Sequence, residues 1–146
     1  MAPFLSSGPS RGTSMTVLID SWVWIEYWKG GDLGEEAARY VEGDEEAIVS
    51  TINIAEVYFW VSRYYNQRTA DEKLRTIEKR AHVIPLEKDV ATEAARIRLK
   101  EKLALADSLV LATARSATAK VVTGDSDLKH IRDVIFLEKS DSRSST

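Results

Sequence analysis

Short apolar runs alternate with longer amphipathic segments along most of the chain. The runs lack polar alternation and are rich in valine, isoleucine and leucine, as is typical of strands buried on both faces of a parallel sheet. They predict strands at residues 16–19, 47–50, 82–86, 120–123 and 133–137. Pro85 lies in the third run, which indicates a sheet edge or the end of a strand.

The intervals between these runs carry apolar residues at helical spacing. Helices are expected at residues 21–29, 35–41, 53–61, 69–80, 89–102 and 103–114. Gly30 and Gly31 should end the first helix, and Thr69 with Glu72 has the spacing of a capping box at the start of the fourth. Strands separated by helices predict the α/β class, as a single-domain α/β/α sandwich with a mainly parallel five-stranded sheet. Right-handed crossovers would bring the carboxyl ends of the strands to one edge.

Composition adds limits to this picture. A chain of 146 residues suits one core, which we place at residues 15–138, with a polar tail at 139–146. Residues 1–14 are rich in serine, glycine and proline, which favours a disordered lead or a cloning remnant over a signal peptide. The absence of cysteine excludes disulfides and thiolate metal sites and fits a cytoplasmic protein. No apolar run is long enough to span a membrane, and the net charge of −3 argues against a wholly basic nucleic-acid surface.

Carboxylates recur at positions that the predicted fold brings to one edge of the sheet. Asp20 directly follows the first strand, Asp125 and Asp127 follow the fourth, and Glu56 and Asp107 lie in or just before first helical turns. Each has an ordinary structural explanation. Glu56 could pair with an asparagine three residues earlier in a capping box, and Asp107 or Asp125 could cap a helix that begins one residue later. Asp107 nevertheless shares an apolar helix stripe, where an unpaired charge is costly.

Several carboxylates without a histidine, cysteine or serine partner point to a cation site. Mutual repulsion prevents all of them from being ionised unless cations are bound. Clusters that offer only oxygen select hard ions such as Mg²⁺ or Mn²⁺. Such a site can bind phosphate through the metal, activate water and stabilise a leaving oxygen. The acidic pattern therefore predicts metal-dependent phosphodiester chemistry.

The chain resembles the PIN domain, and its short length resembles VapC-type toxins of toxin–antitoxin pairs. The resemblance extends from about residue 16 to 137 and rests on four motifs: Leu18-Ile19-Asp20-Ser21, Ser50 with Glu56, Ala106-Asp107 leading into Ala112-Thr113-Ala114, and Thr123-Gly124-Asp125-Ser126-Asp127-Leu128. It implies an endoribonuclease that works as a homodimer and is inhibited by a cognate antitoxin. It also implies a catalytic, metal-binding quartet of Asp20, Glu56, Asp107 and Asp125 for Mg²⁺ or Mn²⁺, with Asp127 as an auxiliary ligand and Ser50 and Thr123 in support.

The chain departs from the family pattern at two positions. Trp22 replaces a common small polar residue, which could narrow the entrance to the site, and Leu128 replaces a common phenylalanine. The aromatic residues between positions 58 and 65 are more than one core stripe requires, and they suggest a dimer or antitoxin contact.

Other functional classes compete with the nuclease. The alternatives to it are a catalytically silent PIN-like binding module and a receiver-type signalling domain. A phosphatase with an Asp-x-Asp motif is excluded because Trp22 stands at the second aspartate position.

Overall fold

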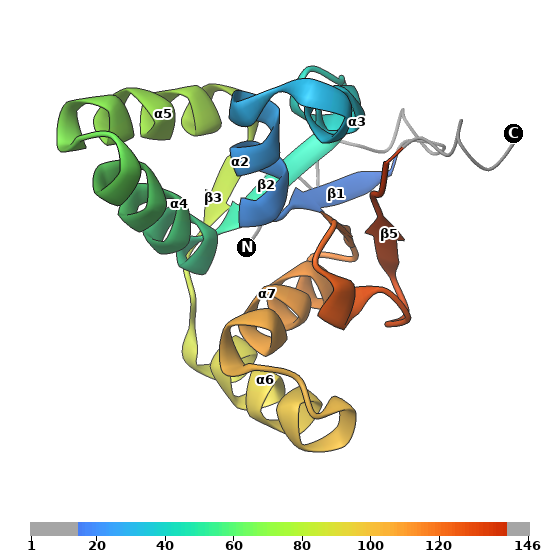
Figure 1. Ribbon diagram of the computed structural model, residues 1–146. Helices are drawn as coiled ribbons and strands as arrows, with labels where there is room; N and C mark the ends of the chain where they lie inside the picture. The colour runs from blue at the N-terminus through green and yellow to red at the C-terminus, as the bar shows by residue number, and fades with distance from the viewer. Residues whose placement is uncertain (1–14, 140–146) are drawn as a thin grey trace, which may run out of the picture.

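The predicted strands form one parallel sheet. The computed structural model describes residues 15–139, in which five strands are arranged in the order β3-β2-β1-β4-β5 (Figure 1). All four neighbouring pairs are parallel. The strands are β1 (Thr16–Ile19), β2 (Glu46–Ser50), β3 (His82–Ile84), β4 (Lys120–Thr123) and β5 (Val134–Phe136). β3 ends just before Pro85 and lies at an edge, as the proline indicated. The expected tail and lead at 140–146 and 1–14 lie outside the described residues.

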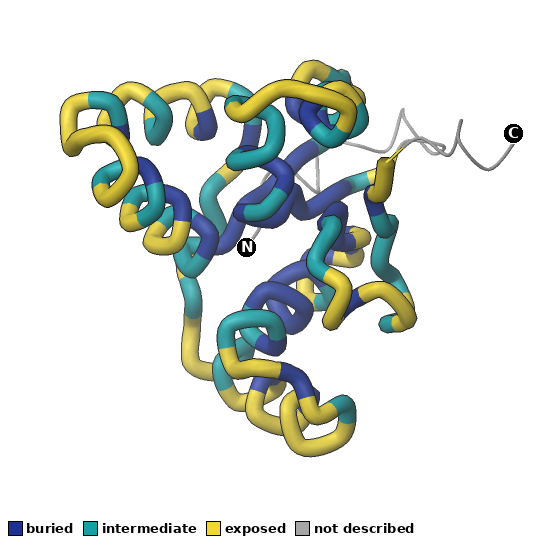
Figure 2. Tube along the Cα trace, viewed as in Figure 1, coloured by how far each residue is buried: buried dark blue, intermediate teal, exposed yellow. Residues whose placement is uncertain are grey.

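The apolar runs are continuous because both faces of the sheet are covered. Val17 and Ile19 of β1 pack into one buried cluster, while Leu18 between them packs into the cluster on the opposite face. The same alternation separates Val49 from Ile48 in β2. Side chains alternate across a strand, so a run without polar positions supplies two cores at once. In Figure 2 the central strands are accordingly buried along their length.

Helices form a layer on each side of the sheet. One core cluster includes α2 (Ser21–Lys29), α3 (Gly31–Val41), α4 (Thr51–Tyr64) and α5 (Gln67–Arg80), and the other includes α6 (Lys88–Glu101) and α7 (Leu105–Ser116). The ribbon shows the two groups on opposite sides (Figure 1). A short 3₁₀ turn, η2 (Ser126–Leu128), follows β4. The predicted α/β/α sandwich is therefore confirmed. Between residues 15 and 139, no helix has both the length and the hydrophobicity needed to cross a bilayer.

Four helices, α3 to α6, begin earlier than the sequence pattern indicated, and α3 and α5 show why. α3 begins at Gly31 rather than near residue 35, because Gly30 and Gly31 adopt φ of 81° and 80° and make a sharp junction with α2. α5 begins at Gln67, where the Asn66 side chain accepts a hydrogen bond from the Thr69 amide at 2.7 Å. The predicted capping box at Thr69 is therefore wrong, since Thr69 already lies inside the helix.

The strand order places a ligand edge between β1 and β4. Chain order reverses there, and open α/β sheets bind ligands outside the carboxyl ends of strands at such a point. A receiver domain instead has the strand order 2-1-3-4-5. The observed order argues against the receiver alternative and directs attention to the residues that follow β1 and β4.

Candidate metal centre

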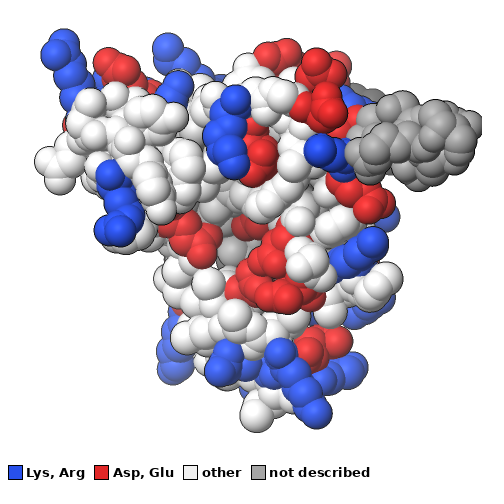
Figure 3. Space-filling view, in the orientation of Figure 1, with Lys and Arg blue, Asp and Glu red and all other residues white. Residues whose placement is uncertain are grey.

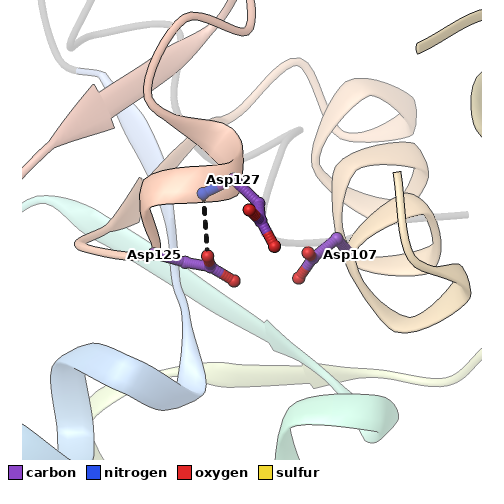
Figure 4. A group of neighbouring side chains, drawn as sticks. All are labelled: Asp107, Asp125 and Asp127. Atoms are coloured by element: carbon purple, nitrogen blue, oxygen red, sulfur yellow. Dashed lines mark hydrogen bonds between the residues drawn. The ribbon is translucent and has the colours of Figure 1, made fainter. Parts of the chain in front are cut away.

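Three aspartates face one another at the carboxyl edge of the sheet. Asp107 comes from the first turn of α7, and Asp125 and Asp127 come from the segment after β4. Carboxylate oxygens of the three lie within 4.8 Å of one another, and Figure 4 shows the side chains pointing toward a common centre. In Figure 3 acidic side chains gather in a hollow between α4 and α7. We call these three residues the aspartate trio.

Asp107 is not a helix cap. α7 begins at Leu105 with Ala104 at the N-cap position, so Asp107 is the third helical residue, and the N-cap position makes no side-chain bond. The explanation of Asp107 as an N-cap is therefore wrong. Burial, and after it the charges of Asp125, Asp20, Asp127 and Glu56, together raise the pKa of its carboxyl to about 7. The repulsion comes from the groups that the sequence pattern singled out.

Asp125 does act as a cap, but that role uses only one of its oxygens. Its Oδ1 accepts a hydrogen bond from the Asp127 amide at 2.9 Å at the start of η2 (Figure 4). Its own amide donates to Thr123 Oγ1 at 3.0 Å. Capping thus fixes the position of the carboxylate at the edge through Oδ1. Structural and ligand roles are compatible in this residue.

Asp20 is buried and tightly held beside the trio. Its Oδ2 accepts a hydrogen bond from Thr123 Oγ1 at 2.7 Å, and its Oδ1 accepts one from Asn53 Nδ2 at 3.0 Å. The pKa of Asp20 is raised to about 6, chiefly by burial. The Thr123 bond opposes this rise, and the charges of Glu56 and Asp125 contribute to it. Thr123 therefore connects Asp20 to the Asp125 backbone.

Glu56 lies on α4 and is held through a serine. Its Oε1 accepts a hydrogen bond from Ser21 Oγ at 2.6 Å. The capping box at the start of α4 is instead formed by Ser50 and Asn53, so the interpretation of Glu56 as a capping residue is wrong. Glu56 is exposed and stands outside the trio, although its charge contributes to the raised pKa of both Asp20 and Asp107.

Asn53 and Ser21 are the positions that sequence reasoning missed. Asn53 Oδ1 accepts from the Ser50 amide at 2.9 Å, while Asn53 Nδ2 donates to Asp20 and, at 2.9 Å, to Ser21 Oγ. Ser50 is fully buried and supports the site indirectly, by capping α4 and orienting Asn53. One asparagine therefore joins β1, α2 and α4. The available signal was the Ser-x-x-Asn spacing of residues 50–53, which fits a capping box.

Replacing Asn53 with alanine should destabilise the protein by about 2–4 kcal/mol. The change removes the cap bond and the amide donor to Asp20 Oδ1 and Ser21 Oγ, while Thr123 still donates to Asp20 Oδ2. Buried acceptors that lose their donor carry the larger part of such a cost. Chemical denaturation would measure the loss. Asn66→Ala is the matched control, since it removes only an exposed cap and should cost about 1 kcal/mol. Equal losses in the two variants would contradict this role for Asn53.

Gly124 provides room for the Trp22 ring beside the acidic edge. A Cβ built at residue 124 would overlap three carbon atoms of the ring. Gly124→Ala should therefore destabilise the protein by about 1–3 kcal/mol, as overpacking usually does. In a Trp22→Ala background the same change should cost close to nothing, because the obstructing ring is gone. A double-mutant cycle measured by chemical denaturation tests this, and a cost that persists without the ring would contradict it.

Comparison with known proteins supports the fold. The family model of the PIN domain matches residues 17–134. No curated protein sequence gives a significant match. A toxin–antitoxin complex from Klebsiella pneumoniae is 24% identical, with 85% of this chain and 99% of that chain covered and a TM-score of 0.71.

Two further solved structures share this architecture. VapC20 from Mycobacterium tuberculosis, described as a Sarcin-Ricin loop cleaving toxin, is 14% identical with a TM-score of 0.69, covering 81% of this chain and 96% of that one. VapBC2 from Rickettsia felis, bound to a promoter DNA fragment, is 16% identical with a TM-score of 0.67, covering 86% and 100%. With the family match extending from β1 to β5, the chain belongs to the PIN domain family.

Proposed function

We propose that the chain is a metal-dependent endoribonuclease that cleaves RNA phosphodiester bonds, and that it is the toxin of a VapBC-type toxin–antitoxin pair. The observation that carries the proposal is the convergence of Asp20, Glu56 and the aspartate trio at the carboxyl ends of β1 and β4. Two of these carboxyls have raised pKa values, because burial and then the neighbouring carboxylates disfavour their charged forms.

The donor set suits Mg²⁺ or Mn²⁺. The trio offers carboxylate oxygens alone, within 4.8 Å of one another, and neither histidine of the chain belongs to it. Hard divalent cations prefer such ligands. Asp107, Asp125 and Asp127 would hold the ion, with Asp20 and Glu56 completing the acidic site. A bound ion of this kind supplies a nucleophilic water at neutral pH and stabilises charge on phosphate oxygens.

The protein's own groups orient the acidic site. Thr123 and Asn53 each fix one oxygen of Asp20, and Ser21 fixes one oxygen of Glu56. Carboxylates that buried side chains hold by hydrogen bonds do not have to reorient when the substrate binds. At neutral pH without a cation, the raised pKa keeps a proton on the Asp107 carboxyl for much of the time. Trp22 stands beside Gly124, and we expect its ring to narrow the approach to this edge.

Two structural neighbours support the biological setting. VapC20 is described as a toxin that cleaves the Sarcin-Ricin loop, and the Klebsiella pneumoniae structure is a toxin–antitoxin complex. By analogy we assign RNA as the substrate class and a cognate antitoxin as the inhibitory partner. These assignments rest on a shared fold, and the acidic edge gives them chemical support.

An exposed aromatic face on α4 and the turn after it suits a protein partner. Phe59, Tyr64 and Tyr65 are 66%, 61% and 64% exposed, and we call these three residues the aromatic face. Large exposed rings are enriched at protein interfaces. We assign this surface to the homodimer or antitoxin contact.

A Phe59→Ser/Tyr64→Ser double variant should be monomeric at concentrations where the wild-type chain is a dimer, because rings that anchor an interface often contribute 2 kcal/mol or more. Sedimentation equilibrium would measure this change. Leu99→Ser is the control, since Leu99 is 81% exposed on α6, away from the aromatic face. A wild-type monomer, or a dimer that both variants retain, would exclude the dimer contact and leave the antitoxin for this surface.

Cleavage of a structured RNA pool tests the proposed activity. Purified protein, free of antitoxin, is incubated with Mg²⁺ or Mn²⁺ and, in parallel, with a chelator. The expected result is cleavage at defined sites that requires the ion, and the map of cuts identifies the RNA. Intact RNA in every condition with well-folded protein would favour the silent PIN-like binding module instead.

A further inference from the structure

A second pocket lies at the opposite end of β4 from the acidic edge. Its lining consists of Arg115, Thr118, Ala119, Lys120, Arg132 and Asp133. These residues come from the last turn of α7, the start of β4 and the segment just before β5. In a parallel sheet the starts of neighbouring strands share one edge, which here is the edge remote from the aspartate trio (Figure 1).

The pocket is cationic although the whole chain is acidic. Three of its lining residues are Arg or Lys and one is Asp, which gives a formal charge of +2 in a chain whose net charge is −3. Asp133 forms a long ion pair with each of the two arginines and leaves the rest of the positive charge unbalanced. Its Oδ2 lies 3.7 Å from Arg115 Nε and 3.9 Å from Arg132 Nε, beyond hydrogen-bond distance in both cases.

Arg115 carries an unsatisfied donor inside the protein. Its side chain is 23% exposed, and its Nε is shielded from solvent without a hydrogen-bond acceptor. Its Nη2 donates to the Arg132 carbonyl at 3.3 Å. A guanidinium presents five N–H donors in a planar fork, which matches the oxygens of a phosphate group. Among the described residues, Nε therefore has no hydrogen-bond acceptor, and its nearest carboxylate is the ion-pair partner Asp133 at 3.7 Å.

Strained backbone brings these cations together. Thr118 and Asp133 both line the pocket, and they adopt left-handed φ of 54° and 70°, which is uncommon for residues other than glycine. The turn at Thr118 is closed by bonds from its amide to the Arg115 carbonyl at 3.2 Å and from the Ala119 amide to the Ala114 carbonyl at 2.8 Å. This turn leads into Lys120, which lines the same pocket as Arg115. Backbone strain that persists around a charged pocket is often associated with a binding role.

We propose that this pocket, with Arg115, Lys120 and Arg132 as donors, binds a phosphate group. The distance from the aspartate trio favours the assignment, because Lys120 begins β4 whereas Asp125 follows its far end, so the acidic site does not repel the ligand at close range. The proposal is independent of the metal centre and of RNA cleavage. Its ligand is either a small phosphate compound or a phosphate of a nucleic acid.

Titration with inorganic phosphate tests the site directly. The full chain, in a phosphate-free buffer containing a chelator, is titrated calorimetrically at low ionic strength. We expect saturable binding that Lys120→Gln and Arg132→Gln each weaken about tenfold, since each removes one charged contact. Both residues are exposed, so the fold should tolerate the changes, which circular dichroism verifies. Arg75→Gln removes an exposed cation on α5 and should leave the affinity unchanged.

A second arm identifies the source of the phosphate. Short RNA oligomers with and without a 5′-phosphate are titrated under the same chelated conditions. If the affinity depends on the 5′-phosphate and is weakened by the Lys120 and Arg132 variants, the ligand is a terminal phosphate. If both oligomers bind equally and the two variants weaken both, the ligand is a backbone phosphate. Absence of inorganic phosphate binding, or the same affinity in the Arg75 control and the two pocket variants, would overturn the proposal.

Discussion

Asp107→Asn should lower the rate of RNA cleavage about 10³-fold or more at saturating Mg²⁺. The change removes one of the three carboxylates that lie within 4.8 Å of one another, and with it several kcal/mol of transition-state stabilisation at about 1.4 kcal/mol per factor of ten. Single-turnover cleavage kinetics would measure the loss. Asparagine preserves the size of the side chain, so the fold of the variant should be intact.

Asp32→Asn is the matched control for this loss. Asp32 is an exposed first-turn aspartate of α3 and loses the same charge far from the trio. The Asp32→Asn variant should cleave RNA at the wild-type rate. Equal activity of wild-type protein and Asp107→Asn would mean that Asp107 is not part of the reacting site, or that a contaminant cleaves the RNA.

Without divalent cations, the free energy of unfolding should fall as the pH rises from about 5 to 8. The folded-state pKa of Asp20 is about 6 and that of Asp107 is about 7, both above the ordinary value of 3.8. At pH values between 3.8 and the folded-state pKa, the carboxyls of Asp20 and Asp107 hold protons in the folded protein that they have released in the unfolded chain. The free energy of unfolding therefore decreases as the pH rises. The stabilising contribution is complete below the unfolded pKa and is lost as the pH passes through 6 and 7. A shift of this size at Asp20 alone corresponds to roughly 3 kcal/mol.

Chemical denaturation at pH 5.5 and pH 8, with chelator and with Mn²⁺, measures this dependence. A cation that binds only the folded state stabilises it, and it should do so more at pH 8, where it does not compete with protons. Asp107→Asn should be more stable than wild-type protein at pH 8 in chelator, because it removes a repelled charge. Stability that is flat or rises between pH 5.5 and 8 in chelator would contradict the raised pKa values.

Hydrophobic pattern was sufficient to locate the sheet and its acidic edge. Val17, Leu18 and Ile19 form an unbroken apolar run because each face of β1 meets a different core, and this double burial is visible in the sequence. Once the strand is located, chain geometry puts Asp20 at its carboxyl end. The same logic placed Asp125 beyond β4, where it lies within reach of Asp107.

Local spacing could not reveal which side chain meets which across the sheet. Asn53 and Glu56 have capping-box spacing, yet Asn53 pairs with Ser50, because α4 begins two residues before Asn53. The contact of Asn53 with Asp20 joins residues 33 positions apart, and that of Ser21 with Glu56 joins residues 35 apart. Such pairings depend on how helices pack against the sheet. Helix starts at Gly31 and Gln67 were missed because they depend on backbone turns at Gly30 and Asn66.

Mn²⁺ binding by purified chain is the most direct test of a cation site built from the trio. Titration followed by electron paramagnetic resonance would count bound ions and give their affinity for wild-type protein, Asp107→Asn and Asp32→Asn, without any RNA present. We expect saturable binding to wild-type protein and Asp32→Asn, and affinity at least about tenfold weaker for Asp107→Asn. No saturable binding to wild-type protein, or equal affinity in all three, would contradict a metal centre at this edge of the sheet.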